Sequence, residues 1–426
     1  MKLVYAVDAY GPNGPIPNSF NMTHEEFFSH YTNTPIIRGL SYFTLPHIHN
    51  FLNYKPLYAH HTDIKRDPNL YLEQGPILYV INLLHMFDLK ENVLTTNSPL
   101  GSWLDSIPKN IIDLWKDKKC KIILFHFWDD VNPNTLDTIV ELFERRFGTS
   151  EGFYIWTTAL TDFIFKKQKN IIIVPYAELW SAHQLPKYYK PIDSTKNKKF
   201  IKLVRRLTPG RVLSHMQFSD ENLNQYGYIS IPKINPNDNI TSLIEYAKQK
   251  ITDLKWKYLI TSENLKSFQL DQVPLADTKK SSYNKNWLGF PDEENLINYH
   301  HNSYFSIVFE SRLEKNKESW FYTEKILRAI LYKQVFILAG SKSALKYMRQ
   351  QGYKTFDPYI DETYDTCDKY EDRITEITRV VKDLCSKDLE ELTLKCNDII
   401  EHNYNNVFTL INNFKLHIET LYDKSN

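Results

Sequence analysis

The chain has 426 residues, of which 42% are hydrophobic and 24% charged, and it contains 28 tyrosines and 24 phenylalanines. This composition excludes an intrinsically disordered protein, and the length favours two domains over one. The formal net charge of +1 gives no overall attraction to nucleic acid or to an acidic membrane surface.

The amino-terminal stretch predicts a strand and not a targeting segment. Residues 2–7 (KLVYAV) form an apolar run too short for a secretion signal. No apolar run in the chain approaches the roughly 20 residues that a membrane helix needs. We therefore expect a soluble, cytoplasmic protein with no membrane partner. The abundance of Lys, Asn, Ile and Tyr fits an AT-rich genome, as in some viruses and bacteria, and the host cytoplasm is the expected location if the source is viral.

Carboxylates follow two of the predicted strands in the first half of the chain. Asp8 begins a loop dense in glycine and proline directly after the first strand. A nearly continuous apolar run at 121–127 predicts a strand covered on both faces, and it leads into Asp129 and Asp130. We expect a general base here, with Asp129 and Asp130 as first candidates and Asp8 behind them. The simpler alternative is that Asp8 and Asp130 cap following helices and Asp129 is structural.

A polar, proline-containing stretch at 183–198 is the best candidate for a linker. We expect a first domain over 1–193 and a second over 194–380, both α/β. Apolar residues at helical spacing predict a helical segment over 381–426. A last short strand is expected at 352–356.

Two arginines follow the first predicted strand of the second half. Residues 199–206 (KFIKLVRR) bring Arg205 to the end of a strand, and the turn 208–210 leads into a helix that starts at Arg211. The rigid donor fork of arginine binds pairs of phosphate oxygens, so Arg205 and Arg211 are expected to contact a diphosphate. A solvated basic face is the competing interpretation.

A β-α-β unit is predicted over 304–340. An apolar run ends on Glu310, Thr323 and Glu324 open an amphipathic segment, and a second apolar run follows. Ligands of parallel sheets gather outside the carboxyl ends of the strands, and a helix start with a nearby lysine, Lys325, suits a phosphate. The alternative is that Thr323 is simply a helix cap, Glu324 a first-turn acid and Glu310 a solvated loop residue.

The run Phe309-Glu310, a loop, then Tyr322-Thr323-Glu324-Lys325 and finally Gly340 resembles the donor-binding signature of the α-1,3-fucosyltransferase family. The region that begins at 199 also looks like the start of the donor domain in its viral and bacterial relatives. The chain has Ser311 where the family has Asn, and it lacks the Val between Tyr and Thr.

The resemblance implies a GT-B fold, in which two Rossmann-like domains face a cleft and the carboxy-terminal helices cross back. It implies an inverting transfer of a sugar from a nucleoside diphosphate sugar to an acceptor hydroxyl, with one carboxylate as base. Glu310 would orient the ribose or the sugar. The other expected donor contacts are Arg205, Arg211, Tyr322, Thr323, Glu324 and Lys325.

No metal site is expected. The chain lacks the Asp-x-Asp pair that holds Mg²⁺ or Mn²⁺ in many transferases, and its four cysteines form no C-x-x-C pair. The spacing of the histidines at 47, 49, 60 and 61 matches none of the helix-borne zinc patterns. We therefore expect no obligatory cofactor other than the nucleotide-sugar donor.

Other functions stay open on the sequence alone. The acceptor is expected to be a glycan, but a hydroxymethylated base in viral DNA is an alternative, with lysines at 166–169 and 196–206 as a local basic strip. A non-catalytic virion or binding protein with a transferase fold belongs to another class. An NAD enzyme is disfavoured because no G-x-G-x-x-G follows the first strand.

Overall fold

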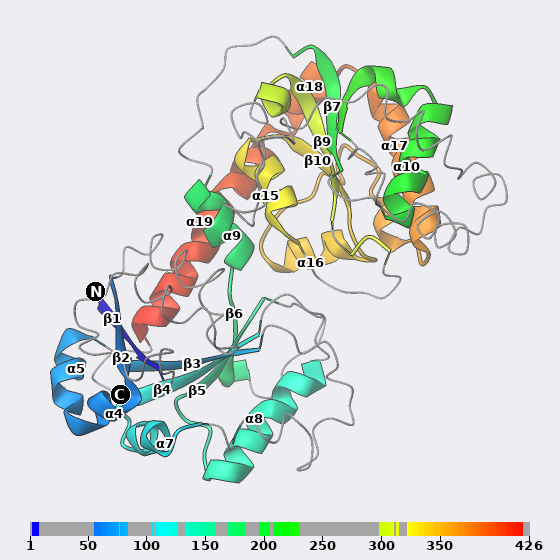
Figure 1. The fold of residues 1–426 in the computed structure, drawn as a ribbon. Coiled ribbons are helices and arrows are strands. Elements are labelled where there is room, and N and C mark those ends of the chain that lie inside the picture. The colour runs from blue at the N-terminus through cyan, green and yellow to red at the C-terminus, as the bar shows by residue number, and fades with distance from the viewer. Residues whose placement is uncertain are drawn as a thin grey trace, which may run out of the picture. The chain divides into compact units, whose positions relative to one another are not determined.

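A computed structural model describes residues 2–7, 55–75, 77–83, 104, 107–126, 133–158, 168–184, 196–204, 208–230, 298–310, 312–314 and 322–420. The chain divides into two compact units (Figure 1). The first unit comprises Met1–His183 together with Leu410–Asn426, and the second comprises Gln184–Thr409. The boundary expected at 193 lies in a stretch outside the described residues.

In its described part, the first unit is built on a six-stranded sheet whose order is β2-β1-β3-β4-β5-β6. Every strand pair is parallel. The strands are β1 (Lys2–Val7), β2 (Lys55–His60), β3 (Ile77–Leu83), β4 (Cys120–His126), β5 (Phe153–Thr157) and β6 (Ile171–Ile173). The helices around them are α4 (His61–Arg66), α5 (Pro68–Gln74), α7 (Lys109–Lys116), α8 (Pro133–Phe147) and α9 (Tyr176–Gln184), with a short 3-10 turn at Gln168–Asn170.

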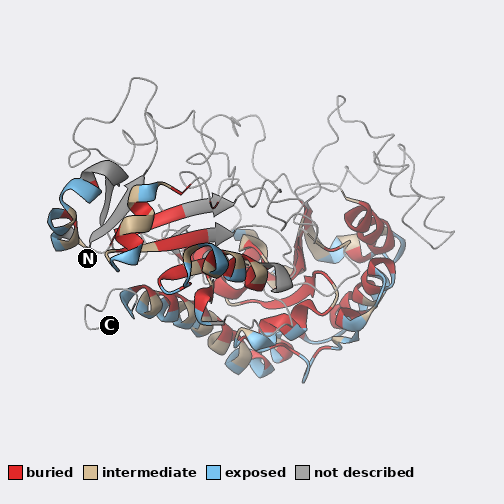
Figure 2. Ribbon diagram, turned by 90° about the horizontal axis from the view of Figure 1, so that it is seen from below, coloured by how far each residue is buried: buried red, intermediate tan, exposed pale blue. Residues whose placement is uncertain are grey.

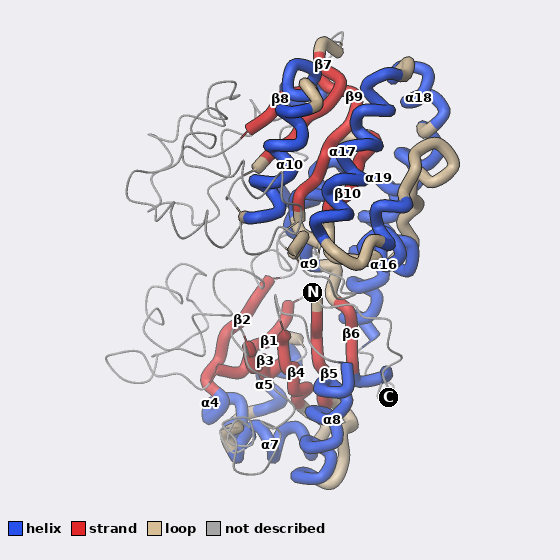
Figure 3. Tube along the Cα trace, turned by 90° about the vertical axis from the view of Figure 1, so that its right-hand side faces the viewer, coloured by secondary structure: helices blue, strands red, loops and turns tan. Residues whose placement is uncertain are grey.

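Helical segments cover both faces of this sheet, as the continuous apolar runs predict. One face carries α4, α7 and α8 (Figure 3). These helices pack over a core that includes Phe143 and Phe153, whose stacked rings have centroids 3.9 Å apart. On the other face, Trp156 of β5 meets Phe414 from the last helix of the chain, with ring centroids 5.3 Å apart. Two-sided burial is why β3 and β4 are mostly apolar.

The second unit holds a four-stranded parallel sheet within the described residues, in the order β10-β9-β7-β8. Its strands are β7 (Lys198–Leu203), β8 (Gly227–Ser230), β9 (Ser303–Phe309) and β10 (Val335–Ala339). Its helices are α10 (Pro209–Asp220), α15 (Glu324–Leu331), α16 (Ala344–Gln350), α17 (Tyr370–Ser386) and α18 (Leu389–Lys395), with 3-10 turns at Leu223–Tyr226 and Thr363–Thr366. The last helix, α19 (Asn397–Thr420), belongs to the second unit up to Thr409 and to the first from Leu410.

The predicted β-α-β unit is confirmed. β9 and β10 pair in parallel with Phe305 opposite Val335. All residues of the two strands except Tyr304 are buried, and Figure 2 colours the described residues by burial. α15 starts one residue after Thr323 and buries one side of its surface against β9 and β10. The mixed α/β architecture with two parallel sheets is therefore compatible with two Rossmann-like domains.

The strand expected at 352–356 is absent from the structure, where that stretch is an irregular segment. The side chain of Asn403 on α19 takes the place of a neighbouring strand: its Oδ1 accepts from the N–H of Lys354 at 2.7 Å and its Nδ2 donates to the carbonyl of Lys354 at 2.8 Å. A local apolar pattern does not reveal that a distant amide satisfies the backbone.

Strand order places a possible ligand site in each unit. β1 lies between β2 and β3, and β7 lies between β8 and β9, so the direction of strand addition reverses beside β1 and beside β7. Open parallel sheets bind ligands outside the carboxyl ends of the strands at such a reversal. None of the described helices is long and apolar enough to cross a membrane.

Candidate functional site

The candidate site lies where the paired strands β7 and β9 end in the second unit. Ile201 of β7 is opposite Ser306 of β9, so the two strands finish at the same edge of the sheet. α10 begins just beyond β7, and Glu310 directly follows the last residue of β9. The start of α10, the carboxylate of Glu310 and the first residues of α15 therefore lie at this edge.

Glu310 holds the start of α15. Its carboxylate is 1% exposed and accepts from the backbone N–H of Thr323 at 3.0 Å and from the Thr323 hydroxyl at 2.8 Å. Thr323 has an extended backbone and occupies the N-cap position of the helix. A buried carboxylate needs such donors because burial without them would disfavour its charge. The alternative in which Glu310 is a solvated loop residue is therefore wrong.

Lys325 brings a positive charge to the same cluster. Its Nζ donates to the Thr323 Oγ1 at 2.8 Å, and it lies 3.6 Å from Glu310 Oε2 and 3.7 Å from Glu324 Oε1. The Lys325 side chain is 23% exposed, against 1% for Glu310. The ammonium group thus stands between two carboxylates at the outer side of the cluster.

Glu324 is partly exposed at the first position of α15. Burial acts to raise the pKa of its carboxyl, but the charges of Lys325 and Arg328 outweigh burial, and the pKa lies below its ordinary value. The carboxylate is therefore ionised at neutral pH and can accept hydrogen bonds from hydroxyl groups.

Arg211 is buried and contacts the protein backbone. Its Nη2 donates to the carbonyl oxygens of Phe309 at 3.2 Å and Glu310 at 3.1 Å, which are the last groups of β9 and the first after it. The helix that carries Arg211 starts at Pro209, and the carboxylate of Glu314 accepts from the N–H of Gly210 at 3.2 Å and from the Thr208 hydroxyl. α10 is thereby tied to the end of β9.

A second arginine, Arg373 on α17, donates to backbone carbonyls near the same edge. Its side chain is completely buried, and it donates to the carbonyls of Leu313 at 3.0 Å, Gly340 at 3.3 Å and Cys367 at 3.0 Å. Sequence reasoning missed Arg373 and Glu314, because most of the groups that they contact are far away in the sequence. No local pattern signals these contacts.

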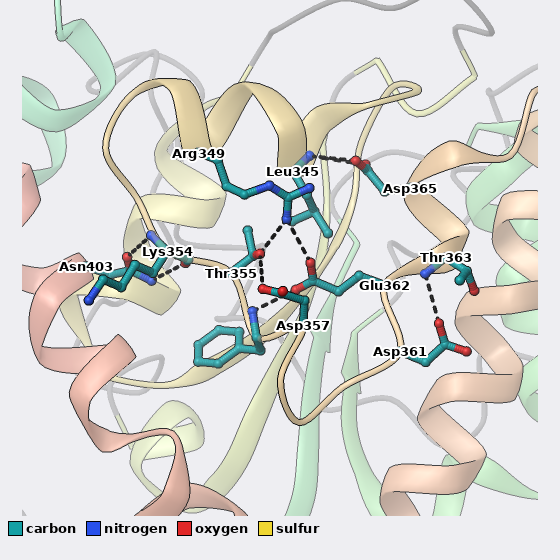
Figure 4. A network of polar contacts seen from close by, with 11 residues as sticks. Leu345, Arg349, Lys354, Thr355, Asp357, Asp361, Glu362, Thr363, Asp365 and Asn403 are labelled. Atoms are coloured by element: carbon teal, nitrogen blue, oxygen red, sulfur yellow. Dashed lines mark hydrogen bonds and ion pairs between the residues drawn. The ribbon is translucent and has the colours of Figure 1, made fainter.

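A further polar cluster surrounds the segment after α16 (Figure 4). Glu362 accepts from the N–H of Phe356 at 2.7 Å and from Arg349 at 3.1 Å, and Arg349 also donates to Thr355 at 2.5 Å. Burial raises the pKa of Glu362 to about 7. Asp365, in the same segment, accepts from the N–H of Leu345 at the start of α16. These contacts fold the segment onto α16.

The structure brings together five of the residues proposed for donor binding. Glu310, Thr323, Glu324 and Lys325 form one contact cluster, and Arg211 contacts the backbone of Glu310. Tyr322, which is half-buried, directly precedes this cluster. Arg205, Asp8, Asp129 and Asp130 lie outside the described residues. The strands that precede these three aspartates, β1 and β4, end at Val7 and His126.

In the part of the chain that the structure describes, no group of three or more His, Cys, Asp or Glu side chains is arranged to hold a metal ion. The four cysteines are free. No family model matches the chain, and no curated protein matches it significantly.

Proposed function

We propose that this protein is an inverting glycosyltransferase that moves a sugar from a nucleoside diphosphate sugar to an acceptor hydroxyl. The observation that carries the proposal is the cluster of Glu310, Thr323, Glu324 and Lys325 at the carboxyl end of β9, beside the strand-order reversal. An ammonium group, an ionised carboxylate and a helix start meet there. Together these groups suit a ligand that has both phosphate and hydroxyl groups.

In the proposed reaction, the donor domain stabilises the leaving group. The acceptor oxygen attacks C1 of the sugar, its proton passes to a base, and the C1–O bond to the diphosphate breaks on the opposite face. Lys325 and Arg205 would offset the charge that develops on the diphosphate, so no metal is obligatory. Glu324 would accept hydrogen bonds from the ribose or the sugar, and Tyr322 would contact the nucleotide. The base would be Asp129, Asp130 or Asp8.

The contacts of the second unit's lysines weigh against the DNA alternative. The basic strip proposed for DNA binding includes lysines that donate to groups of their own unit: Lys196 to the carbonyl of Ser303 at 2.8 Å, Lys198 to that of Gln225 at 2.9 Å, and Lys199 to that of Cys385. Lys202 is completely buried. These lysines are not arranged as a row of free charges for a phosphate backbone. Salt-sensitive binding to duplex DNA would favour the DNA alternative instead.

A thermal-shift screen with the common nucleoside diphosphates and their sugar derivatives tests the proposal. We expect one base and one sugar to raise the melting temperature, because a ligand that binds only the folded state stabilises it. Lys325→Met should weaken binding of that nucleoside diphosphate by about tenfold or more, since a charged contact is lost. Glu324→Gln should weaken binding of the sugar nucleotide and lower the transfer rate.

Lys382→Met is the matched control for the lysine variant. Lys382 lies on α17, is 62% exposed and pairs with Glu221 on the surface, so its loss should leave nucleotide binding unchanged. Wild-type binding in the Lys325→Met and Glu324→Gln variants would contradict the assigned site. A complete lack of stabilisation by any nucleotide would instead favour the non-catalytic structural protein.

A further inference from the structure

Four residues form a continuous line of contacts at the carboxyl end of β9. Arg211 on α10 donates to the carbonyls of Phe309 and Glu310. The Glu310 carboxylate then accepts from Thr323, and the Thr323 hydroxyl accepts from Lys325 Nζ at 2.8 Å. The line therefore joins α10, β9 and α15.

The first three members of the line are buried, and only its last member is partly exposed. Arg211 is 6% exposed, Glu310 1% and Thr323 6%, whereas the side chain of Lys325 is 23% exposed. Of the four, Lys325 is the one with a charged group at the protein surface. Lys325 is therefore the member of the line that a diphosphate can contact most readily.

We propose that Arg211 and Glu310 are positioning residues that fix the Lys325 ammonium, and that they do not themselves contact the donor. This inference rests on the proposed function, and it changes the roles expected from the sequence, where Arg211 is a phosphate ligand and Glu310 a sugar or ribose ligand. Arg211 sets the position of the Glu310 backbone, and the Glu310 carboxylate sets Thr323 and attracts the ammonium.

The physical reason lies in the geometry of the guanidinium group. One Nη2 spans two successive carbonyl oxygens, at 3.2 and 3.1 Å. The ammonium of lysine lies one bond closer to the backbone than Nη2, so a lysine at this position does not reach both carbonyls in the same geometry. Lysine is nevertheless a good phosphate ligand. Arg211→Lys should therefore abolish a contact of Arg211 with the backbone, whereas it should largely preserve a contact with a phosphate.

A double-mutant cycle tests the proposal with the nucleoside diphosphate that stabilises the wild-type protein most. Arg211→Lys should raise its dissociation constant about tenfold in the wild-type background, as expected for the loss of a charged hydrogen-bonding group. In the Lys325→Met background the same substitution should change it less than about twofold, because Arg211 acts through Lys325. Glu310→Gln should show the same dependence on Lys325. Equal factors in both backgrounds would overturn the proposal, as would full retention of affinity in Arg211→Lys.

Hydrogen exchange of the ligand-free protein provides a second readout, independent of any nucleotide. In Arg211→Lys, the amide of Thr323, which donates to Glu310, should exchange about tenfold faster, whereas the amide of Ile330 in the same helix should keep its protection. Unchanged exchange at Thr323 would overturn the proposal even if nucleotides bind. If no nucleotide binds the wild-type protein, the proposed function fails, and the exchange result still decides whether Arg211 positions the start of α15.

Discussion

The environment of Lys202 differs strongly from what its side-chain type prefers. It is completely buried on β7, where its Nζ donates to Ser214 Oγ at 2.9 Å and lies 4.0 Å from the ring centroid of Phe218. Burial holds the pKa of this amine well below its ordinary value. In the unfolded chain the amine binds a proton up to a pH near 10.4. The buried site therefore lowers the stability of the fold at neutral pH, and this penalty shrinks as the pH rises towards 10.4.

We expect Lys202→Met to stabilise the second unit by about 1–2 kcal/mol at pH 7, because an apolar side chain of similar length has no charge to desolvate. The freed Ser214 hydroxyl can donate to a backbone carbonyl one turn earlier in α10. Urea unfolding at pH 7 and pH 9.5 measures the effect, and the gain should be smaller at the higher pH. Lys198→Met on the same strand is the control, because its amine is exposed. A loss of stability in Lys202→Met would show that Ser214 and the aromatic rings compensate for burial.

The β9–α15–β10 element is fixed at both of its ends. At the carboxyl ends of the strands, Glu310 binds Thr323. At the opposite ends, Gln334 is buried: its Oε1 contacts His300 Nδ1 at 2.5 Å, and its Nε2 donates to the carbonyl of His300 at 2.6 Å. Ser306 of β9 also donates to Gln334 Oε1, at 2.6 Å. These contacts fix the position of α15 relative to β9 and β10.

His300 makes the stability of this element depend on pH. Burial lowers the pKa of its imidazole to about 3, and the nearby charges of Arg328 and Lys196 act in the same direction. In the unfolded chain the ring takes up a proton near pH 6.5. The contribution of the unprotonated ring to the free energy of unfolding is therefore fully present above pH 6.5. The free energy of unfolding falls as the pH drops towards 3, by about 1.4 kcal/mol for each pH unit.

His300→Gln should remove this dependence. Between pH 6.5 and pH 5, we expect the wild-type protein to lose about 2 kcal/mol of unfolding free energy through this site, and the variant to lose correspondingly less. Urea titrations at the two pH values, followed by a probe in the second unit, measure the difference. If both proteins lose the same stability, His300 is not the group that titrates.

At the scale of the whole molecule, residues at the end of the chain complete the hydrophobic core of the first unit. The residues from Leu410 onward belong to the first unit, although α19 starts in the second. Phe414 is 3% exposed and meets Trp156, which is 2% exposed. His417 contacts Tyr154 on the same strand, with ring centroids 6.1 Å apart. The first unit therefore needs residues that follow the entire second unit in the sequence.

We expect Phe414→Ala to destabilise the first unit by about 3–5 kcal/mol, because it removes a buried ring and leaves a cavity beside Trp156. Hydrogen exchange read by mass spectrometry should show faster exchange in peptides from β4 and β5 and little change in those from β9 and β10. Phe408→Ala is the control on the same helix, because Phe408 is only partly buried and lies in the second unit. Faster exchange in the second unit alone would contradict this division of the chain.

Local patterns in the sequence predicted several elements of the two units correctly. Continuous apolar runs marked β4, β9 and β10, because strands covered on both faces need apolar side chains at every position. Thr323 was expected as the start of a helix, since its hydroxyl can accept a backbone N–H there. Glu310 was expected at a strand end. These features depend on neighbours a few residues away, so the sequence by itself determined them.

The tertiary structure alone decided which partners the charged side chains take. Arg211 reaches backbone carbonyls 98 and 99 positions away in the sequence, Lys202 is enclosed between β7 and α10, and Asn403 satisfies the segment where a strand was expected. A charged residue at a strand end looks the same in the sequence whether it faces a ligand or the backbone. Its surroundings come from segments that meet only when the chain folds, and hydrogen-bond geometry then selects the partner.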